Sequence, residues 1–150
     1  MLADQLDREI LELLVEDPRQ SYRSIAKKLG VSHVNVSNRV KEMEDQGKIK
    51  GYTTIYDPDT LGYYPLCLRI SASTGQDLSL IGRRISGKKS ISVVMRVSGE
   101  CELLALAMCR DRGSALDLLN ELGQISGIGK IESHVVLETI KIGGVSLRKD

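Results

Sequence analysis

The sequence predicts an α+β chain made of a helical N-terminal third and a βαββαβ C-terminal half. In residues 4–46 apolar side chains recur every three or four positions, the spacing of amphipathic helices. Beyond residue 64, segments of alternating apolar and polar residues are interrupted by two helical segments. The segment between them, residues 58–63, contains proline and glycine and is typical of a connection. We predict domains over residues 1–57 and 64–150, joined by a linker over 58–63.

The composition is that of a globular chain with an apolar core. The 150 residues are 41% hydrophobic, which is enough for one domain or two small ones. No basic-then-apolar leader opens the sequence, and its longest apolar stretch, residues 103–109, is too short to cross a bilayer. Cys67, Cys101 and Cys109 lack metal-type spacing, so we expect partly buried thiols and no metal site. We therefore expect a cytoplasmic protein without a membrane partner.

Three helices are predicted in the N-terminal third. The first covers residues 4–17 and is stopped by Pro18. Ser21 offers an N-cap for a second, short helix, and Gly30 stands where a left-handed residue is favoured at a helix end. Ser32 offers the next N-cap, for a third helix that ends near Gly47 and buries three residues, Val36, Val40 and Met43. Two short helices joined by so tight a turn indicate a helix-turn-helix.

A strand or small β-wing is predicted directly after the third helix. Residues 49–57 alternate loosely and are rich in Thr, Tyr and Ile, which favour strands. The N-terminal domain is therefore predicted to be a winged helix-turn-helix.

The C-terminal half is predicted to hold four strands and two helices, in the order of a ferredoxin-like fold. The strands are expected over residues 66–72, 91–97, 103–109 and 130–142. One helix follows Asp77, and the other carries its apolar face at Ala115, Leu116, Leu119 and Leu122. In this fold both helices cover one face of an antiparallel sheet. Because residues 103–109 are apolar on both faces, either that strand is a crowded core position or the free face packs on another subunit.

The net charge of +1 hides a strongly basic segment. Residues 18–41 contain no acid, whereas the residues before them are rich in acids, so the basic segment is a candidate surface for phosphates. If the third helix buries its apolar stripe, five polar residues remain for its outer faces: His33, Asn35, Asn38, Arg39 and Lys41. Asparagine pairs with adenine and arginine with guanine in the major groove of DNA.

Nearly the whole chain resembles the leucine-responsive and asparagine-synthetase regulators, the Lrp/AsnC or feast/famine family of transcription regulators. The resemblance is carried by LDREI at the start, by SHVNVSNRVKEME followed by GKIKGY, and by TIYDPDTLGY. The βαββαβ half resembles the family's amino-acid-sensing domain, also called RAM or ACT-like. The resemblance implies binding to double-stranded DNA, an amino-acid effector and no other cofactor. It also implies homodimers formed by the C-terminal sheets, often assembled into tetramers or octamers.

The resemblance places contacts to phosphate on and before the second helix, and contacts to bases on the third. Lys48 and Lys50 are expected to add wing contacts. The expected DNA-binding residues are Arg19, Arg23, Lys27, Lys28, Ser32, His33, Asn35, Asn38, Arg39 and Lys41.

The effector site is expected at a loop where the family has a turn of the form Gly-x-aromatic-Asp. Here the loop reads Ser98, Gly99, Glu100, Cys101, Glu102, so a cysteine replaces the aromatic residue and a glutamate the aspartate. We expect Glu102 to accept hydrogen bonds from an ammonium group, and N–H groups near Gly99 to bind a carboxylate. Ser133 on the last strand is expected to add a hydroxyl. The alternative is an ordinary hairpin with a solvated acid.

No catalytic residues are expected. His33 and His134 lie far apart in the sequence, and neither has a nucleophile or metal constellation nearby. Certain haem-pathway decarboxylases resemble the same family and use His and Arg of the C-terminal half, but their class would favour a degenerate DNA-binding module. The basic third helix here is intact, so we expect no enzyme.

Overall fold

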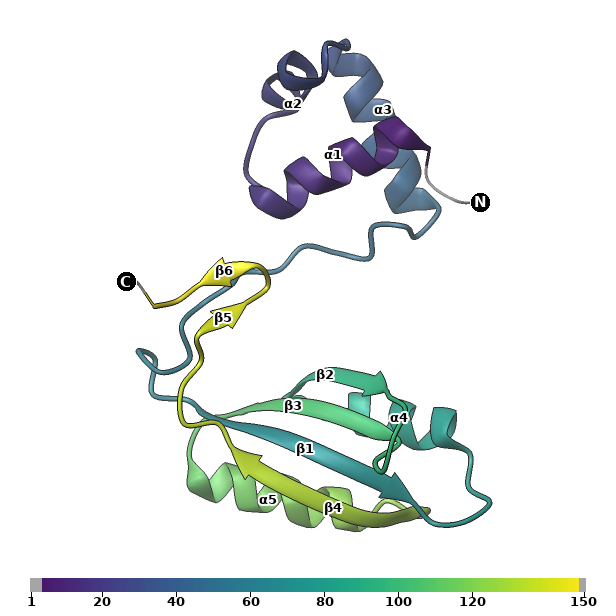
Figure 1. Ribbon diagram of the computed structural model, residues 1–150, viewed down its shortest axis with the longest axis vertical. Helices are drawn as coiled ribbons and strands as arrows, with labels where there is room; N and C mark the ends of the chain where they lie inside the picture. The colour runs from purple at the N-terminus through teal and green to yellow at the C-terminus, as the bar shows by residue number, and fades with distance from the viewer. Residues whose placement is uncertain (1–3, 149–150) are drawn as a thin grey trace. The chain divides into compact units, whose positions relative to one another are not determined.

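The computed structural model describes residues 4–148, and its helices and strands confirm the α+β class (Figure 1). The outer ends of the two predicted domains, residues 1–3 and 149–150, lie outside the described residues. The chain forms two compact units, one reaching Ile55 and including Ile142–Ser146, the other covering Tyr56–Lys141 and the residues from Leu147 onward. The domain limits given above stay a prediction. No helix in residues 4–148 is long and apolar enough to cross a membrane.

The first unit contains the three expected helices, α1 (Gln5–Glu16), α2 (Tyr22–Leu29) and α3 (His33–Asp45). Ser21 and Ser32 cap α2 and α3, each accepting a hydrogen bond from a backbone N–H three residues later. Gly30 ends α2 with φ of 68°, a conformation that a side chain would strain. The helices enclose one apolar core, formed by Ile10, Leu14, Ile25, Ala26, Val36, Val40 and Met43.

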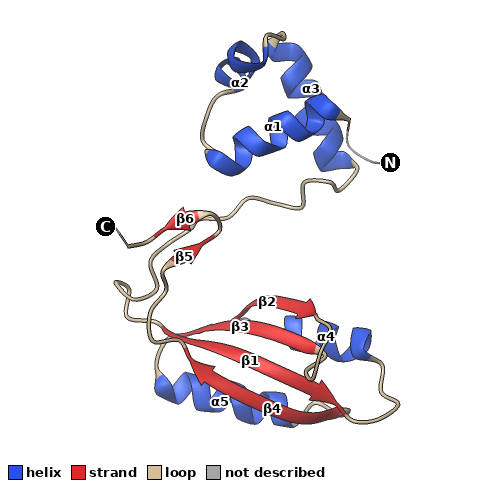
Figure 2. Cartoon of the chain, viewed as in Figure 1, coloured by secondary structure: helices blue, strands red, loops and turns tan. Residues whose placement is uncertain are grey.

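The strand predicted over residues 49–57 is wrong. In the structure this segment is a loop, drawn in tan in Figure 2. A strand needs a hydrogen-bonded neighbour, and among residues 4–148 no strand forms a ladder with this segment. Gly143 lies against the side chain of Ile55, but β5 and β6 pair only with each other. A short hairpin that the sequence analysis missed, β5 (Lys141–Ile142) with β6 (Val145–Ser146), turns at Gly143 and Gly144, both with positive φ. That Gly-Gly pair is a typical hairpin signal.

The second unit has the predicted βαββαβ order and an antiparallel sheet with strand order β2-β3-β1-β4, which is the ferredoxin-like arrangement. The last strand ends at Val135, seven residues before the predicted end at 142. The elements are β1 (Tyr64–Ala72), α4 (Leu78–Ser86), β2 (Ile91–Arg96), β3 (Leu103–Cys109), α5 (Arg112–Gly123) and β4 (Ile128–Val135). On α5 the expected apolar face is partly wrong, because Leu116 is exposed and Leu118 is buried in its place.

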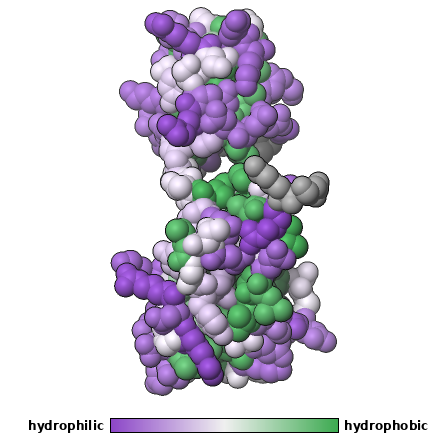
Figure 3. Space-filling model, turned by 90° about the vertical axis from the view of Figure 1, so that its left-hand side faces the viewer, coloured by the Kyte–Doolittle hydropathy of each residue, from purple (hydrophilic) through white to green (hydrophobic). Residues whose placement is uncertain are grey.

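Both helices of this unit lie on one face of the sheet (Figure 1). On β3, Leu103, Ala105 and Ala107 point to the helices and are buried, while Leu104 and Leu106 point the other way and are half-buried. We call the second side the open face; its apolar part consists of Val93, Met95, Leu104, Leu106 and Met108. The space-filling view in Figure 3 also shows hydrophobic residues on the surface of this unit. Within this unit, the helices therefore cover one side of the sheet only.

Candidate nucleic-acid interface and effector site

The outer surface of α3 is a candidate reading surface for DNA. Val34, Asn38 and Lys41 are spaced by four and three residues, so they lie on one side of the helix, opposite the buried stripe. All three are exposed, and Val34 exposes 54% of its surface. His33 is also exposed, at the first turn of α3, and Ser32 caps that turn. Asn35 was also expected to be exposed, but it is half-buried.

The expectation that Arg39 is exposed on α3 is wrong. Its Nη1 lies 2.6 Å from Oδ2 of Asp4 and 2.9 Å from Oδ1 of Asp7, and its Nε donates a hydrogen bond to Oδ1 of Asn35. Only 28% of the side chain is exposed. The reason is its position beside the buried residue Val40, which turns the guanidinium toward α1 instead of solvent.

Asp7 explains why Arg39 is held there. Among residues 4–148 it is the one charged residue that is buried, with 7% of its surface exposed. A buried carboxylate is costly unless it is paired, and Asp7 has two cations, Arg39 at 2.9 Å and Lys48 at 3.4 Å. The hydrogen bonds that Asp4 accepts, first from the backbone N–H of Asp7 and then from Arg39, lower the pKa of Asp4. Arg39 and Lys48 are thus committed to holding α3 and the chain after it against α1.

The basic residues on and before α2 have the opposite character. Arg19, Arg23, Lys27 and Lys28 are exposed, and within residues 4–148 none of them forms an ion pair. Lys28 donates a hydrogen bond to the side-chain amide of Gln20 at 3.2 Å, which leaves its charge uncompensated. These four cations are therefore available to phosphates.

The segment after α3 is tied back to that helix by the backbone N–H groups of Lys48 and Ile49, which donate to the carbonyl of Met43, and by the side chain of Tyr52. The hydroxyl of Tyr52 donates a hydrogen bond to Oε1 of Glu44 at 2.7 Å, and this bond raises the pKa of Tyr52 to about 12. Lys50, two residues earlier, is exposed.

The predicted effector loop joins β2 to β3 and lies beside the end of β1. Glu102 is half-buried, and its Oε2 accepts a hydrogen bond from the backbone N–H of Ala72 at 2.9 Å. The carbonyl of Glu100 accepts one from the hydroxyl of Ser71. Ser98 and Gly99 are exposed at the tip, where Gly99 has φ of 118°. One carboxylate oxygen of Glu102 is therefore used by the fold.

Arg69 is a residue at this loop that the sequence analysis missed. It lies on the open face of β1, with its guanidinium 3.7 Å from Glu100 and 3.2 Å from Glu132. A hydrogen bond with the side chain of Cys101 and the charge of Glu132 raise the pKa of Arg69. The alternation of β1 signals its position, since Arg69 falls between the buried residues Leu68 and Ile70.

Ser133 is not brought to this loop within the chain. It pairs with Leu68, whereas the loop leads into Leu103, which pairs with Ile70. The register also puts Ser133 on the helix-covered side of the sheet, away from Arg69. A site that uses both Ser133 and residues 98–102 would need a second chain.

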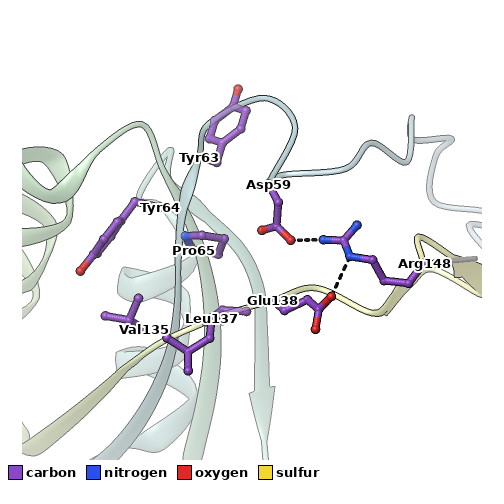
Figure 4. A pocket seen from close by; sticks show the side chains of 9 residues that line it. Asp59, Tyr63, Tyr64, Pro65, Val135, Leu137, Glu138 and Arg148 are labelled. Atoms are coloured by element: carbon purple, nitrogen blue, oxygen red, sulfur yellow. Dashed lines mark hydrogen bonds and ion pairs between the residues drawn. The ribbon is translucent and has the colours of Figure 1, made fainter.

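A hollow of about 710 Å³ lies at the other end of β1 from this loop (Figure 4). Arg148 forms ion pairs with Asp57, Asp59 and Glu138 beside it. It thus ties Asp57, the last residue of the predicted N-terminal domain, and Asp59 of the predicted linker to the chain that follows β4. Pro58 is fully buried in the same segment. The hollow is lined by Asp59, Tyr63, Tyr64, Pro65, Val135, Val136, Leu137, Glu138 and Arg148.

Residues 4–50 match the family model of winged helix-turn-helix DNA-binding domains. A winged helix-turn-helix module joined to a separate βαββαβ domain is typical of DNA-binding regulators, in which the second domain serves sensing or assembly. Residues 66–145 match the model of the Lrp/AsnC ligand binding domain. The chain belongs to the Lrp/AsnC family of transcriptional regulators, as the sequence motifs predicted.

Relatives match along nearly their whole length. An uncharacterised HTH-type transcriptional regulator of Pyrococcus furiosus is 37% identical over 141 residues, covering 94% of this chain and 95% of that protein. The structure of E. coli AsnC is 27% identical, with a TM-score of 0.73 over 95% of this chain and 97% of AsnC. A Neisseria meningitidis regulator, solved as an L-methionine complex, has a similar fold, with 22% identity and a TM-score of 0.75 over 94% of each chain. The relatives are regulators, in agreement with the expected absence of enzymatic function.

Replacing Arg39 with alanine is predicted to lower the free energy of unfolding by about 1–3 kcal/mol, because Asp7 would be left buried with Lys48, at 3.4 Å, as its remaining cation. Urea denaturation of the full chain measures this change. The matched control is Lys41→Ala on the same helix, which removes an exposed cation and is expected to change stability by less than about 0.5 kcal/mol. Equal stability of the two variants would return Arg39 to the residues free to contact DNA.

Proposed function

We propose that this regulator binds operator DNA as a homodimer, that α3 reads bases in the major groove, and that the C-terminal domain binds an amino acid. One observation carries the DNA-binding part. The outward side of α3 and the four cations Arg19, Arg23, Lys27 and Lys28 are exposed and have no acidic partners, although the same unit uses Arg39 and Lys48 for internal ion pairs.

In this proposal the residues of the module divide into two groups. His33, Asn38 and Lys41 contact base edges or nearby phosphates, with Ser32 and Asn35 at the first turn. The exposed cations on and before α2 contact phosphates, and so set affinity and register without selecting a sequence. Arg39 is withdrawn as a base-reading residue and becomes a positioning residue, because it links α3 to Asp4 and Asp7.

Two alanine variants are predicted to separate these groups. Lys27→Ala should weaken binding to a selected operator and to random duplex by the same factor, and should reduce the slope of log affinity against log salt by about 1. Asn38→Ala should weaken binding to the operator by about 5- to 100-fold and change binding to random duplex little. Fluorescence anisotropy at several salt concentrations measures both. A loss by Asn38→Ala that is equal on both duplexes would contradict base reading by α3.

The proposed dimer rests on the open face of the sheet. Leu104, Leu106 and Met108 of β3 are apolar and half-buried on that face, with Val93 and Met95 of β2 beside them. The two helices of this unit, α4 and α5, pack on the other side of the sheet. A second copy of the same face would remove this apolar surface from water, and a closed two-fold arrangement is the commonest form of soluble oligomer.

The two faces of β3 give a matched pair of variants for the dimer. Leu106→Glu places a charge on the open face and is predicted to leave a folded chain of half the native mass by light scattering. Ala105→Glu places the charge in the core, where Ala105 has no exposed surface, and is predicted to unfold the domain. A Leu106→Glu chain that keeps the mass of the native protein would exclude the open face as the interface.

An amino acid suits the chemistry of the loop beside β1. The ammonium group of an amino acid needs an acidic partner, and its carboxylate needs hydrogen-bond donors. Glu102, Arg69 and the backbone N–H groups of the exposed residues near Gly99 lie around one turn. The L-methionine complex of the Neisseria meningitidis relative supports an amino acid as the class of effector. The departures at Cys101 and Glu102 from the family's turn leave the side chain of the effector open.

A thermal-shift screen of the twenty amino acids with the full chain tests this part. A ligand at one hundred times its dissociation constant should stabilise the native protein by about 2.7 kcal/mol. Glu102→Gln should abolish the shift, because it removes the charge but retains an oxygen for the N–H of Ala72. A shift retained in that variant would move the site elsewhere, with the hollow near Tyr63 as the next place to examine. The absence of any shift at millimolar concentration would contradict amino-acid sensing.

A further inference from the structure

Val34 is out of place for a residue that only builds α3. It lies in the first turn of the helix, 54% of its surface is exposed, and it packs on neither apolar core. A β-branched residue also lowers helix propensity slightly. Its neighbours on the same side of the helix, Asn38 and Lys41, are polar. Neither packing nor helix stability therefore explains a valine here.

The major groove of DNA offers one apolar group at its base edges, the 5-methyl group of thymine. Side chains near the N-terminus of a recognition helix are the ones that reach those edges. We propose that Val34 contacts the methyl group of a thymine, and that Asn38, one turn further along α3, binds the base pair next to it. This inference rests on the proposed function and adds a sequence requirement, a thymine at a fixed position in each half-site.

Position distinguishes Val34 from an ordinary exposed valine. Single apolar residues on a surface are common and need no explanation of their own. Val15 on α1 is such a residue, and it is more exposed, at 74%. It does not lie on α3, so it cannot share the reading surface with Asn38. Val15 is therefore the matched control for Val34.

The test uses an operator selected from random duplexes by the full-length protein. Each thymine of that operator is replaced in turn by deoxyuridine, which lacks only the methyl group. At one position of either half-site, a single deoxyuridine is expected to weaken binding of the native protein about fourfold. Fourfold corresponds to about 0.8 kcal/mol, the value of one buried methyl group. Val34→Ala should bind the thymine and uridine operators equally, whereas Val15→Ala should discriminate between them as the native protein does.

Two results would overturn the inference while leaving the proposed function intact. One is an operator that binds equally well with uridine at every position. The other is a Val34→Ala protein that still discriminates between thymine and uridine. Failure to enrich any sequence would overturn sequence-specific binding itself, and the inference with it.

Discussion

The arrangement of this protein depends on one strand, β3, that is apolar on both sides of a sheet with helices on only one side. Leu103, Ala105 and Ala107 are buried under the helices, while Leu104 and Leu106 lie on the open face. Water in contact with that face is unfavourable, and both helices of the second unit lie on the other side of the sheet. The proposed dimer follows from this constraint. Two recognition helices, and thus a two-part operator, follow from the dimer.

A second constraint operates inside the DNA-binding module. Burial of Asp7 between α1 and α3 demands a cation, and Arg39 meets that demand from the recognition helix itself. The basic residues of the module therefore serve two purposes that the sequence does not separate. Arg39, beside the buried stripe of α3, fixes the orientation of that helix, and the exposed cations of α2 form no ion pair among residues 4–148 and are the proposed contacts to phosphates.

The sequence predicted those features that depend on neighbouring residues. The N-caps at Ser21 and Ser32, the end of α2 at Gly30 and the βαββαβ order all follow from local chemistry and periodicity. Features that depend on distant partners were missed. The ion pair of Arg39 joins it to Asp4, 35 positions earlier in the sequence. Residues 49–57 have strand-forming composition, but no strand among residues 4–148 forms a hydrogen-bond ladder with them. The place of Ser133 within the sheet is likewise set by the pairing of β4 with β1, and periodicity alone does not give that register.

In the proposed assembly two chains, joined through their sheets, hold two α3 helices at a fixed separation on DNA. The most direct test changes the spacing of the two half-sites in the selected operator. Five inserted base pairs turn one half-site by about half a helical turn, and ten restore its face. If the separation is fixed, five base pairs should reduce the affinity toward that of random duplex, and ten should restore a large part of it. Affinity that is unchanged by the five-base-pair insertion would contradict the proposed assembly.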